Sequence, residues 1–132
     1  MATLKIHNTL GNIKEEFVPV HPSNVRIYAC GPTVYDYAHI GNARMAVVND
    51  LLVRLLRMLY PKVTYVSNIT DIDDKIIESA QNSNTPFQEL TRKFEKIYNE
   101  DMFALGVLLP DVQPRATEYI KDMIELIKKL IK

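Results

Sequence analysis

The sequence predicts an α/β fold built on a parallel sheet. Two runs of β-branched and aromatic residues, at 25–30 and 63–68, flank a long apolar helical pattern. A strand, a helix and a second strand within ~45 residues form a βαβ unit, whose strands run parallel with a right-handed crossover. Because parallel sheets are normally covered on both faces, a sheet of only two strands would be unusually exposed.

The composition is that of one ordinary domain. The chain has 132 residues, of which 47% are apolar, and this excludes a disordered segment. Its 16 basic and 16 acidic residues cancel, so bulk charge does not draw it to nucleic acid. A single cysteine, Cys30, excludes an internal disulfide framework. No apolar run approaches membrane-spanning length and no secretory signal opens the chain, so we expect a cytoplasmic protein without membrane contact.

The first elements end at clear signals. Residues 1–24 mix apolar pairs with polar residues and predict a loosely attached leader with a short strand near its start. Gly31 and Pro32 stop the strand at 25–30. The helix predicted for 40–60 is apolar on more than one stripe, so we expect it to bury a wide face against the sheet.

The remainder of the chain is predicted to be helical. One helix covers 71–83, with three aspartates in its first turn, where the macrodipole favours acids. A second starts with Thr85 as N-cap and proline at the first helical position, and Gly106 ends it. A third starts near Pro114 and is still in phase at the last residue, a pattern typical of a chain that continues.

Cys30 directly follows the first strand and precedes a glycine turn. Ligands of α/β proteins bind at this carboxyl end of the strands. A cysteine there serves as a nucleophile, as a metal ligand or as a small core residue, and the residues alone leave these alternatives open.

A second cluster, 39–42 (HIGN), opens the long helix. His39 and Asn42 both project toward the helix N-terminus, where unpaired N–H groups and the dipole attract an anion. Gly41 lets a flat ligand approach the backbone. These residues predict a phosphate or nucleotide site. The alternative is that His39 or Asn42 only caps the helix and that Gly41 only eases packing.

Two further clusters accompany these. Because residues 68–74 follow the second strand, Asn68 and Thr70 are expected beside the Cys30 loop, as ligand-binding groups or as helix caps. The aspartates suggest a divalent metal, but the last two point in different directions on a helix. The run 35–37 (YDY) predicts a pocket wall, with packing over the end of the sheet as the alternative.

Taken together, these clusters resemble the cysteinyl-tRNA synthetase family. The resemblance is dense over 30–44 (CGPTVYDYAHIGNAR) and 65–77 (YVSNITDIDDKII), and 114–117 (PRAT) extends it. It implies the first half of a class I Rossmann-type (HUP-like) parallel sheet at 25–83. The helical segment at 84–132 would be the start of an insertion domain.

The resemblance also implies an activity and its partners. The family activates L-cysteine with ATP and Mg²⁺, giving cysteinyl-adenylate and pyrophosphate. It then transfers the cysteinyl group to the 3′ end of tRNA(Cys) in protein synthesis. A cytoplasmic, monomeric full-length enzyme is implied with it.

The ATP site would be formed by the HIGN segment, which stands where the family has its HIGH motif. His39 and Asn42 would stabilise the phosphates as the α-phosphorus is attacked, and Gly41 would make room for adenine. Asn42 replaces the usual final histidine with an uncharged group that still donates hydrogen bonds.

The cysteine site is implied by neighbouring positions. Gly31, Thr33 and Thr70 would line it, while Asn68 and the acids after it would brace the loop. Cys30 matches the first ligand of a Zn²⁺ ion that binds the substrate thiolate. Serine has nearly the shape of cysteine, and zinc with soft ligands prefers sulfur to a hydroxyl.

Several parts of the family pattern do not occur in this sequence. The remaining zinc ligands (a second Cys, a His and a Glu), the Lys-Met-Ser-Lys-Ser loop and the anticodon-binding helices come later in that family. We therefore expect an N-terminal fragment that, by itself, neither binds zinc tightly nor activates cysteine.

Two other functions remain open on these residues. The cysteine ligase of mycothiol synthesis shares the motifs and the zinc chemistry but uses a small amine as acceptor, and residues 75–77 and 114–117 favour the synthetase. A non-catalytic truncated paralogue that acts as a binding module fits the short length. The intact Cys30 and the HIGH-like segment argue against that paralogue.

Overall fold

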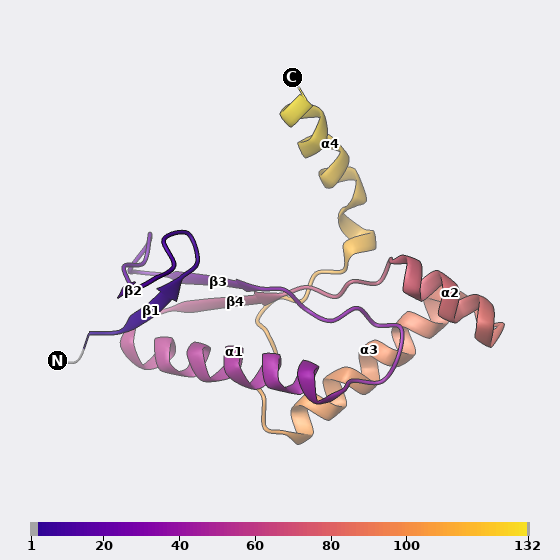
Figure 1. The fold of residues 1–132 in the computed structure, drawn as a ribbon, viewed down its shortest axis with the longest axis horizontal. Coiled ribbons are helices and arrows are strands. Elements are labelled where there is room, and N and C mark those ends of the chain that lie inside the picture. The colour runs from indigo at the N-terminus through magenta and orange to yellow at the C-terminus, as the bar shows by residue number, and fades with distance from the viewer. Residues whose placement is uncertain (1–2, 132) are drawn as a thin grey trace.

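A computed structural model describes residues 3–131 and confirms the α/β fold class (Figure 1). A parallel pair of strands is flanked by helices, and a separate hairpin lies at the N-terminus. In chain order the elements are β1 (Lys5–Asn8), β2 (Ile13–Glu16), β3 (Val25–Ala29), α1 (Ile40–Leu59), β4 (Val63–Ser67), α2 (Asp74–Ser83), α3 (Phe87–Ala104), the 3-10 turn η1 (Ala116–Tyr119) and α4 (Ile120–Ile131).

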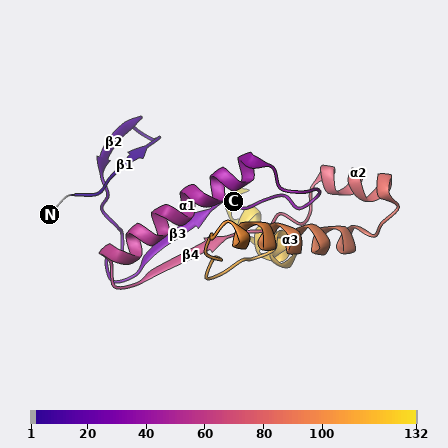
Figure 2. The same cartoon turned by 90° about the horizontal axis from the view of Figure 1, so that it is seen from below.

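The predicted βαβ unit is the centre of the fold. β3 and β4 pair in parallel, with Val25 opposite Val63. α1 lies along one face of this pair (Figures 1 and 2). Val53 and Leu56 of α1, each 1% exposed, pack against the alternate strand residues that face the helix. The wide apolar face expected for α1 is only partly buried, because Leu51 and other apolar side chains of this helix remain exposed.

Residues 111–116 run beside the free edge of β4 and act as a third strand. The Ser67 amide donates to the Val112 carbonyl (3.1 Å) and the Ile69 amide to the Pro114 carbonyl (2.8 Å). The bridges between the two segments are parallel. The sheet has the two strands that the sequence predicts, and a segment without a strand-like sequence pattern covers the edge that such a sheet would leave open.

The N-terminal segment is an antiparallel hairpin of β1 and β2, whose turn places Asn12 at a φ of 50°. After the hairpin, the Phe17 ring meets Tyr60 edge-on with centroids 6.1 Å apart. Leu4 and Phe17 pack against the core around Val25. The short strand predicted near the start is confirmed. Leu4 and Phe17 thus join the segment to the core, while the hairpin itself pairs only within its own two strands, and the description of residues 1–24 as a loosely attached leader stays a prediction.

α2 begins at Asp74, three residues later than predicted. Thr70 forms a parallel bridge with Thr33, so the chain stays extended past β4. Asp73 is then the N-cap, and its carboxylate accepts the amide of the second helical residue at 2.9 Å. The predicted first turn at 71–73 is therefore wrong, because strand pairing keeps these residues out of the helix.

α3 begins one residue later than an N-cap at Thr85 requires. Pro86 is the N-cap, and the Thr85 hydroxyl donates instead to the Ser83 carbonyl (3.2 Å). Gly106 follows the end of α3 with a φ of +77°, as a helix-ending glycine should.

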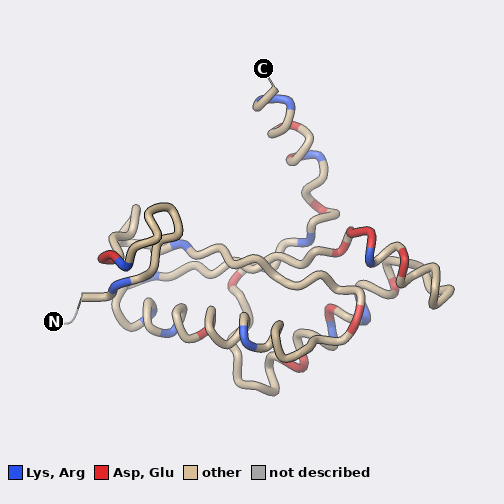
Figure 3. The backbone as a smooth tube through the Cα atoms, in the orientation of Figure 1, with Lys and Arg blue, Asp and Glu red and all other residues tan. Residues whose placement is uncertain are grey.

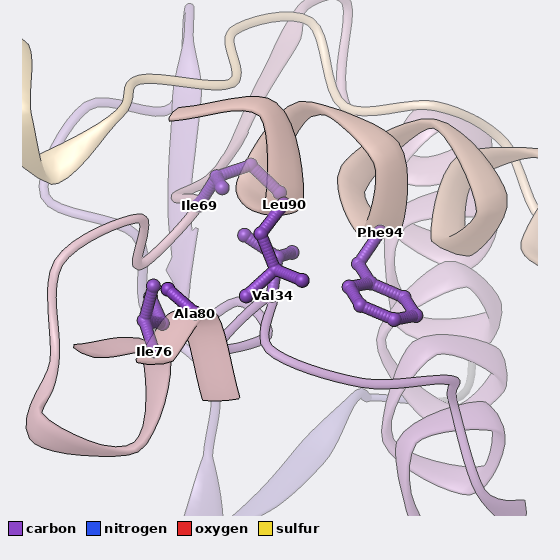
Figure 4. Packing of buried hydrophobic residues seen from close by; sticks show 6 residues of the cluster. All are labelled: Val34, Ile69, Ile76, Ala80, Leu90 and Phe94. Atoms are coloured by element: carbon purple, nitrogen blue, oxygen red, sulfur yellow. The ribbon is translucent and has the colours of Figure 1, made fainter. Parts of the chain in front are cut away.

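α2 and α3 form a hairpin over the carboxyl ends of β3 and β4 (Figure 2). The buried residues that join them come from both helices and from the loops after both strands: Val34, Ile69, Ile76, Ala80, Leu90 and Phe94 (Figure 4). This cluster fixes the two loops on which the predicted site residues lie.

α4 extends away from the rest of the described chain (Figure 1). The 3-10 turn η1 precedes it, so the α-helix starts later than the predicted Pro114. Its apolar face, which includes Ile120, Met123, Ile124 and Ile127, is exposed within the part of the chain that the structure describes.

Candidate active site

A cavity of about 290 Å³ opens beyond the carboxyl ends of the parallel strands. Residues 31–39 and Asn42 form most of its wall, and α2 and α3 contribute Lys75 and Tyr98. Open α/β sheets bind their ligands at this edge. A larger hollow of about 480 Å³ lies against the N-terminal hairpin and is lined by none of the predicted site residues.

The loops after β3 and β4 meet at Gly31. The Asn68 side-chain oxygen accepts the Gly31 amide (3.0 Å), and the Asn68 amide nitrogen donates to the Thr70 hydroxyl (3.1 Å). A Cβ on Gly31 would lie 1.6 Å from the Asn68 carbonyl oxygen, so only glycine fits this approach. The predicted contact between the two loops is confirmed, and Asn68 braces them as expected.

Thr33 and Thr70 are neighbours on adjacent extended segments. The Thr70 amide donates to the Pro32 carbonyl (2.9 Å), and the Thr70 carbonyl accepts the Val34 amide (3.2 Å). Thr33 lines the cavity together with Gly31, whereas Thr70 is not one of the residues that line it. The structure therefore brings the three predicted cysteine-site residues together, with two of them facing the cavity.

His39 and Asn42 form a reciprocal capping box at the start of α1. The Gly41 amide donates to His39 Nδ1 (2.9 Å), and the His39 amide donates to Asn42 Oδ1 (3.0 Å). Because Nδ1 accepts, the proton of the neutral imidazole lies on Nε2. The groups left over, His39 Nε2–H and the Asn42 side-chain amide, are both donors. Capping and anion binding are thus compatible, although the sequence left them as alternatives.

The absence of a side chain at Gly41 leaves space for the His39 imidazole. A Cβ on Gly41 would lie 2.6 Å from His39 Cε1 and 2.9 Å from Nδ1. A larger residue here would push the ring out of its capping position. Gly41 itself does not line the cavity, so the expected space for adenine stays a prediction.

Cys30 lies at the carboxyl end of β3 with an exposed thiol. Sγ has only a weak contact with the Gly31 carbonyl, at 3.9 Å. Residues 3–131 contain no group of three or more side chains able to hold a metal ion. One soft donor suits zinc, but a zinc site needs at least three protein ligands. The described residues therefore do not form a zinc site by themselves.

Tyr35, Asp36 and Tyr37 line the cavity, which confirms the predicted pocket wall. Tyr37 meets Phe94 of α3 edge-on, with centroids 5.3 Å apart. The Asp36 carboxylate accepts the Tyr37 amide at 2.7 Å. These contacts give the aromatic wall a fixed position against α3.

Lys75 and Tyr98 are cavity residues that the sequence did not reveal. Lys75 lies in the first turn of α2, and its ammonium is 5.5 Å from the centroid of the Tyr35 ring. Burial raises the pKa of the Tyr98 phenol to about 12, so this side chain stays protonated. Both residues lie on helices that pack against the loop after β3. This packing joins segments that are far apart in the sequence, so no local sequence pattern indicates it.

Asp71 joins the site loop to the segment that follows α3. Its carboxylate is buried and accepts both the amide (3.0 Å) and the hydroxyl (2.6 Å) of Thr117. Nearby, Arg115 pairs with Glu95 of α3 at 2.7 Å, and this hydrogen bond raises the pKa of Arg115. The bracing role expected for the acids after Asn68 is confirmed for Asp71, from an extended segment rather than a helical turn.

Comparison of the sequence with known proteins identifies the family. Residues 16–132 match the family described as tRNA synthetases class I (C) catalytic domain. The chain belongs to this family. It is 57% identical over 129 residues to the cysteine–tRNA ligase of Rhodospirillum rubrum, 59% over 126 to that of Ehrlichia ruminantium (strain Gardel) and 55% over 130 to that of Burkholderia mallei (strain SAVP1).

These alignments cover 96–98% of this class I synthetase chain and 28% of each relative. The chain thus spans about 28% of the length of the curated relatives that it matches. The resemblance found in the sequence is confirmed. Among the described residues, no helix combines the length and the apolar character needed to cross a bilayer.

Proposed function

We propose that the protein carrying this chain is a cysteine–tRNA ligase. The observation that supports this most directly is the shared cavity, whose wall includes Gly31, Thr33, His39 and Asn42. An amino acid held by the loop after β3 and a triphosphate held by the start of α1 would meet in one space. The names and identities of the relatives support the same activity.

The first step joins cysteine to the nucleotide. A carboxylate oxygen of L-cysteine attacks the α-phosphorus of ATP, and the bond to the oxygen that bridges to the β-phosphate breaks. Pyrophosphate leaves with Mg²⁺, and cysteinyl-adenylate remains. His39 Nε2–H and the Asn42 amide donate to phosphate oxygens as negative charge moves. A donor aimed at developing charge contributes ~10²–10³ in rate.

The second step transfers the amino acid. A ribose hydroxyl at the 3′ end of tRNA(Cys) attacks the carbonyl carbon of the adenylate, and AMP leaves. Cytoplasmic location and action as a monomer belong to the same proposal and follow from the resemblance alone.

Selection of cysteine is assigned to the loops after β3 and β4. Gly31, Thr33 and Thr70 would surround the amino acid, and Cys30 would be one ligand of a zinc ion whose other ligands lie outside the described residues. Bound zinc would supply a preference for the substrate thiolate over the hydroxyl of serine. The exposed position of the Cys30 thiol at the strand end is compatible with this role.

Amino-acid-dependent exchange between pyrophosphate and ATP tests the proposal. With the full-length protein, cysteine should support exchange, and serine should support it at least ~10³-fold less well, as a site built around a specific ligand group allows. Aminoacylation of tRNA(Cys) then separates this function from ligation to a small amine. Exchange supported by serine or by another amino acid, but not by cysteine, would refute the assignment.

A further inference from the structure

Lys75 is the member of the cavity wall whose charge the local helix does not favour. It lies in the first turn of α2, directly after Asp73 and Asp74 in sequence, and it lines the cavity. Figure 3 shows acidic (red) and basic (blue) positions next to one another at the start of α2. A positive charge there opposes the helix dipole, whereas Asp73 and Asp74 suit the same place. Lys75 forms no salt bridge with any described residue. A residue whose charge is unfavourable for its own helix is typical of functional positions.

The ammonium of Lys75 is held by an aromatic contact that leaves its charge available. It stands 5.5 Å from the centroid of the Tyr35 ring, and both residues line the cavity. A cation over a ring face is stabilised but not neutralised. Asp36 is the carboxylate of the same wall, and one of its oxygens already accepts the Tyr37 amide.

Lys75 is also the one permanent cation on this wall. The other donors on the cavity wall near the start of α1 are the His39 Nε2–H and the Asn42 amide, which the capping box leaves unused. Together the three side chains offer several donors and one full positive charge to the same space. A ligand with several anionic oxygens matches this set.

We propose that Lys75 binds the phosphate chain of the nucleotide together with His39 and Asn42. The inference rests on the proposed function for the identity of the nucleotide, and it adds a residue that the HIGN segment does not contain. The triphosphate is preferred over the cysteine carboxylate as partner, because it carries several negative charges while zwitterionic cysteine carries no net charge.

The test uses three variants of the full-length protein. Lys75→Met removes the charge and keeps the length of the side chain, and Lys75→Arg keeps the charge. Lys93→Met is the matched control, because the Lys93 ammonium also lies over a ring, 5.1 Å from Phe94, but does not line the cavity. The readouts are the KM values for ATP and for cysteine in pyrophosphate exchange, and calorimetric binding of magnesium pyrophosphate without any turnover.

Lys75→Met should raise the KM for ATP and weaken pyrophosphate binding by about tenfold or more, with the KM for cysteine changed less than about twofold. Lys75→Arg and Lys93→Met should stay within about threefold of the unsubstituted protein. Unchanged ATP and pyrophosphate values in Lys75→Met would overturn the inference, and so would a rise confined to the KM for cysteine. Failure of the proposed function gives a different result from failure of this inference. If the proposed function is wrong, the unsubstituted protein shows no cysteine-dependent exchange, and the pyrophosphate-binding measurement still tests Lys75.

Discussion

His39 and Asn42 each use one polar group to close the helix and leave another free for a ligand. His39 Nδ1 accepts the Gly41 amide and Asn42 Oδ1 accepts the His39 amide. What remains on both side chains is an N–H donor, which suits a phosphate. Under the proposed function, the uncharged asparagine at the last position of the segment would offer its amide to a phosphate while Oδ1 holds the cap.

Gly41→Ala should disturb chemistry more than stability. The added Cβ would lie 2.6 Å from the His39 ring, so the imidazole must leave its capping position. We expect kcat for pyrophosphate exchange to fall by about tenfold or more, since the donor is displaced. Loss of the cap should lower the free energy of unfolding by about 1 kcal/mol. An alanine variant with full activity would show that the ring position is unimportant.

Tyr98 should make the protein sensitive to strongly alkaline pH. Its pKa is about 12 in the folded chain because of burial, against 10.0 for an ordinary tyrosine. Between these values the unfolded chain loses the proton first, so stability is full below pH 10 and falls as the pH rises toward 12. Burial also raises the pKa of Tyr65, which adds to the same trend. Melting temperatures measured across this range should fall less steeply in Tyr98→Phe.

At the scale of elements, two segments that lack a strand pattern complete the site. The extended residues after β4 pair with Thr33 on one side and with Arg115 on the other. The sequence predicted β3, α1 and β4 nearly to the residue, because periodicity and the stop at Gly31 and Pro32 are local signals. It could not predict the third strand or the late start of α2, because both depend on partners more than 35 residues away.

The bond between Asp71 and Thr117 should control how firmly this third segment holds the site loop. Thr117→Val removes the hydroxyl that donates to Asp71 at 2.6 Å and leaves a buried carboxylate oxygen without its partner. The local opening free energy should fall by about 1–3 kcal/mol. Hydrogen exchange of amides 69–71 and 112–117 measures this, with Thr117→Ser as the control that restores the bond. Equal exchange in the valine variant would contradict the bracing role.

At the scale of the whole molecule, the cavity wall combines predicted site residues from one stretch of the chain with residues of two later helices. The resemblance placed Gly31, Thr33, His39 and Asn42 correctly in one cavity wall. It did not reveal Lys75 and Tyr98, which reach the wall only because α2 and α3 fold back over the strand ends. Their positions follow from packing of Phe94 and Ile76, and no local pattern encodes that packing.

The 132-residue chain should self-associate through α4. Ile124 and Ile127 belong to the apolar face of the amphipathic helix α4 and are 45% and 53% exposed. Exposed apolar faces of this kind favour association between copies of a chain. Sedimentation equilibrium should show mass rising with concentration, and Ile124→Glu with Ile127→Glu should shift the chain toward monomer. Lys129→Glu, on the polar face, is the control. A concentration-independent monomer would show that this face does not self-associate.

The most direct test of the account is Asn42→Asp in the full-length protein. Aspartate keeps an oxygen for the His39 amide and is favourable at a helix N-terminus, so the melting temperature should be unchanged or higher. It also replaces the free donor by a negative oxygen, so calorimetric ATP affinity should fall by about tenfold or more. Asn42→His, which can both accept and donate, should bind ATP within about threefold of the unsubstituted protein. ATP binding by Asn42→Asp at unsubstituted strength would contradict the central claim that this capping box presents its free donors to phosphate.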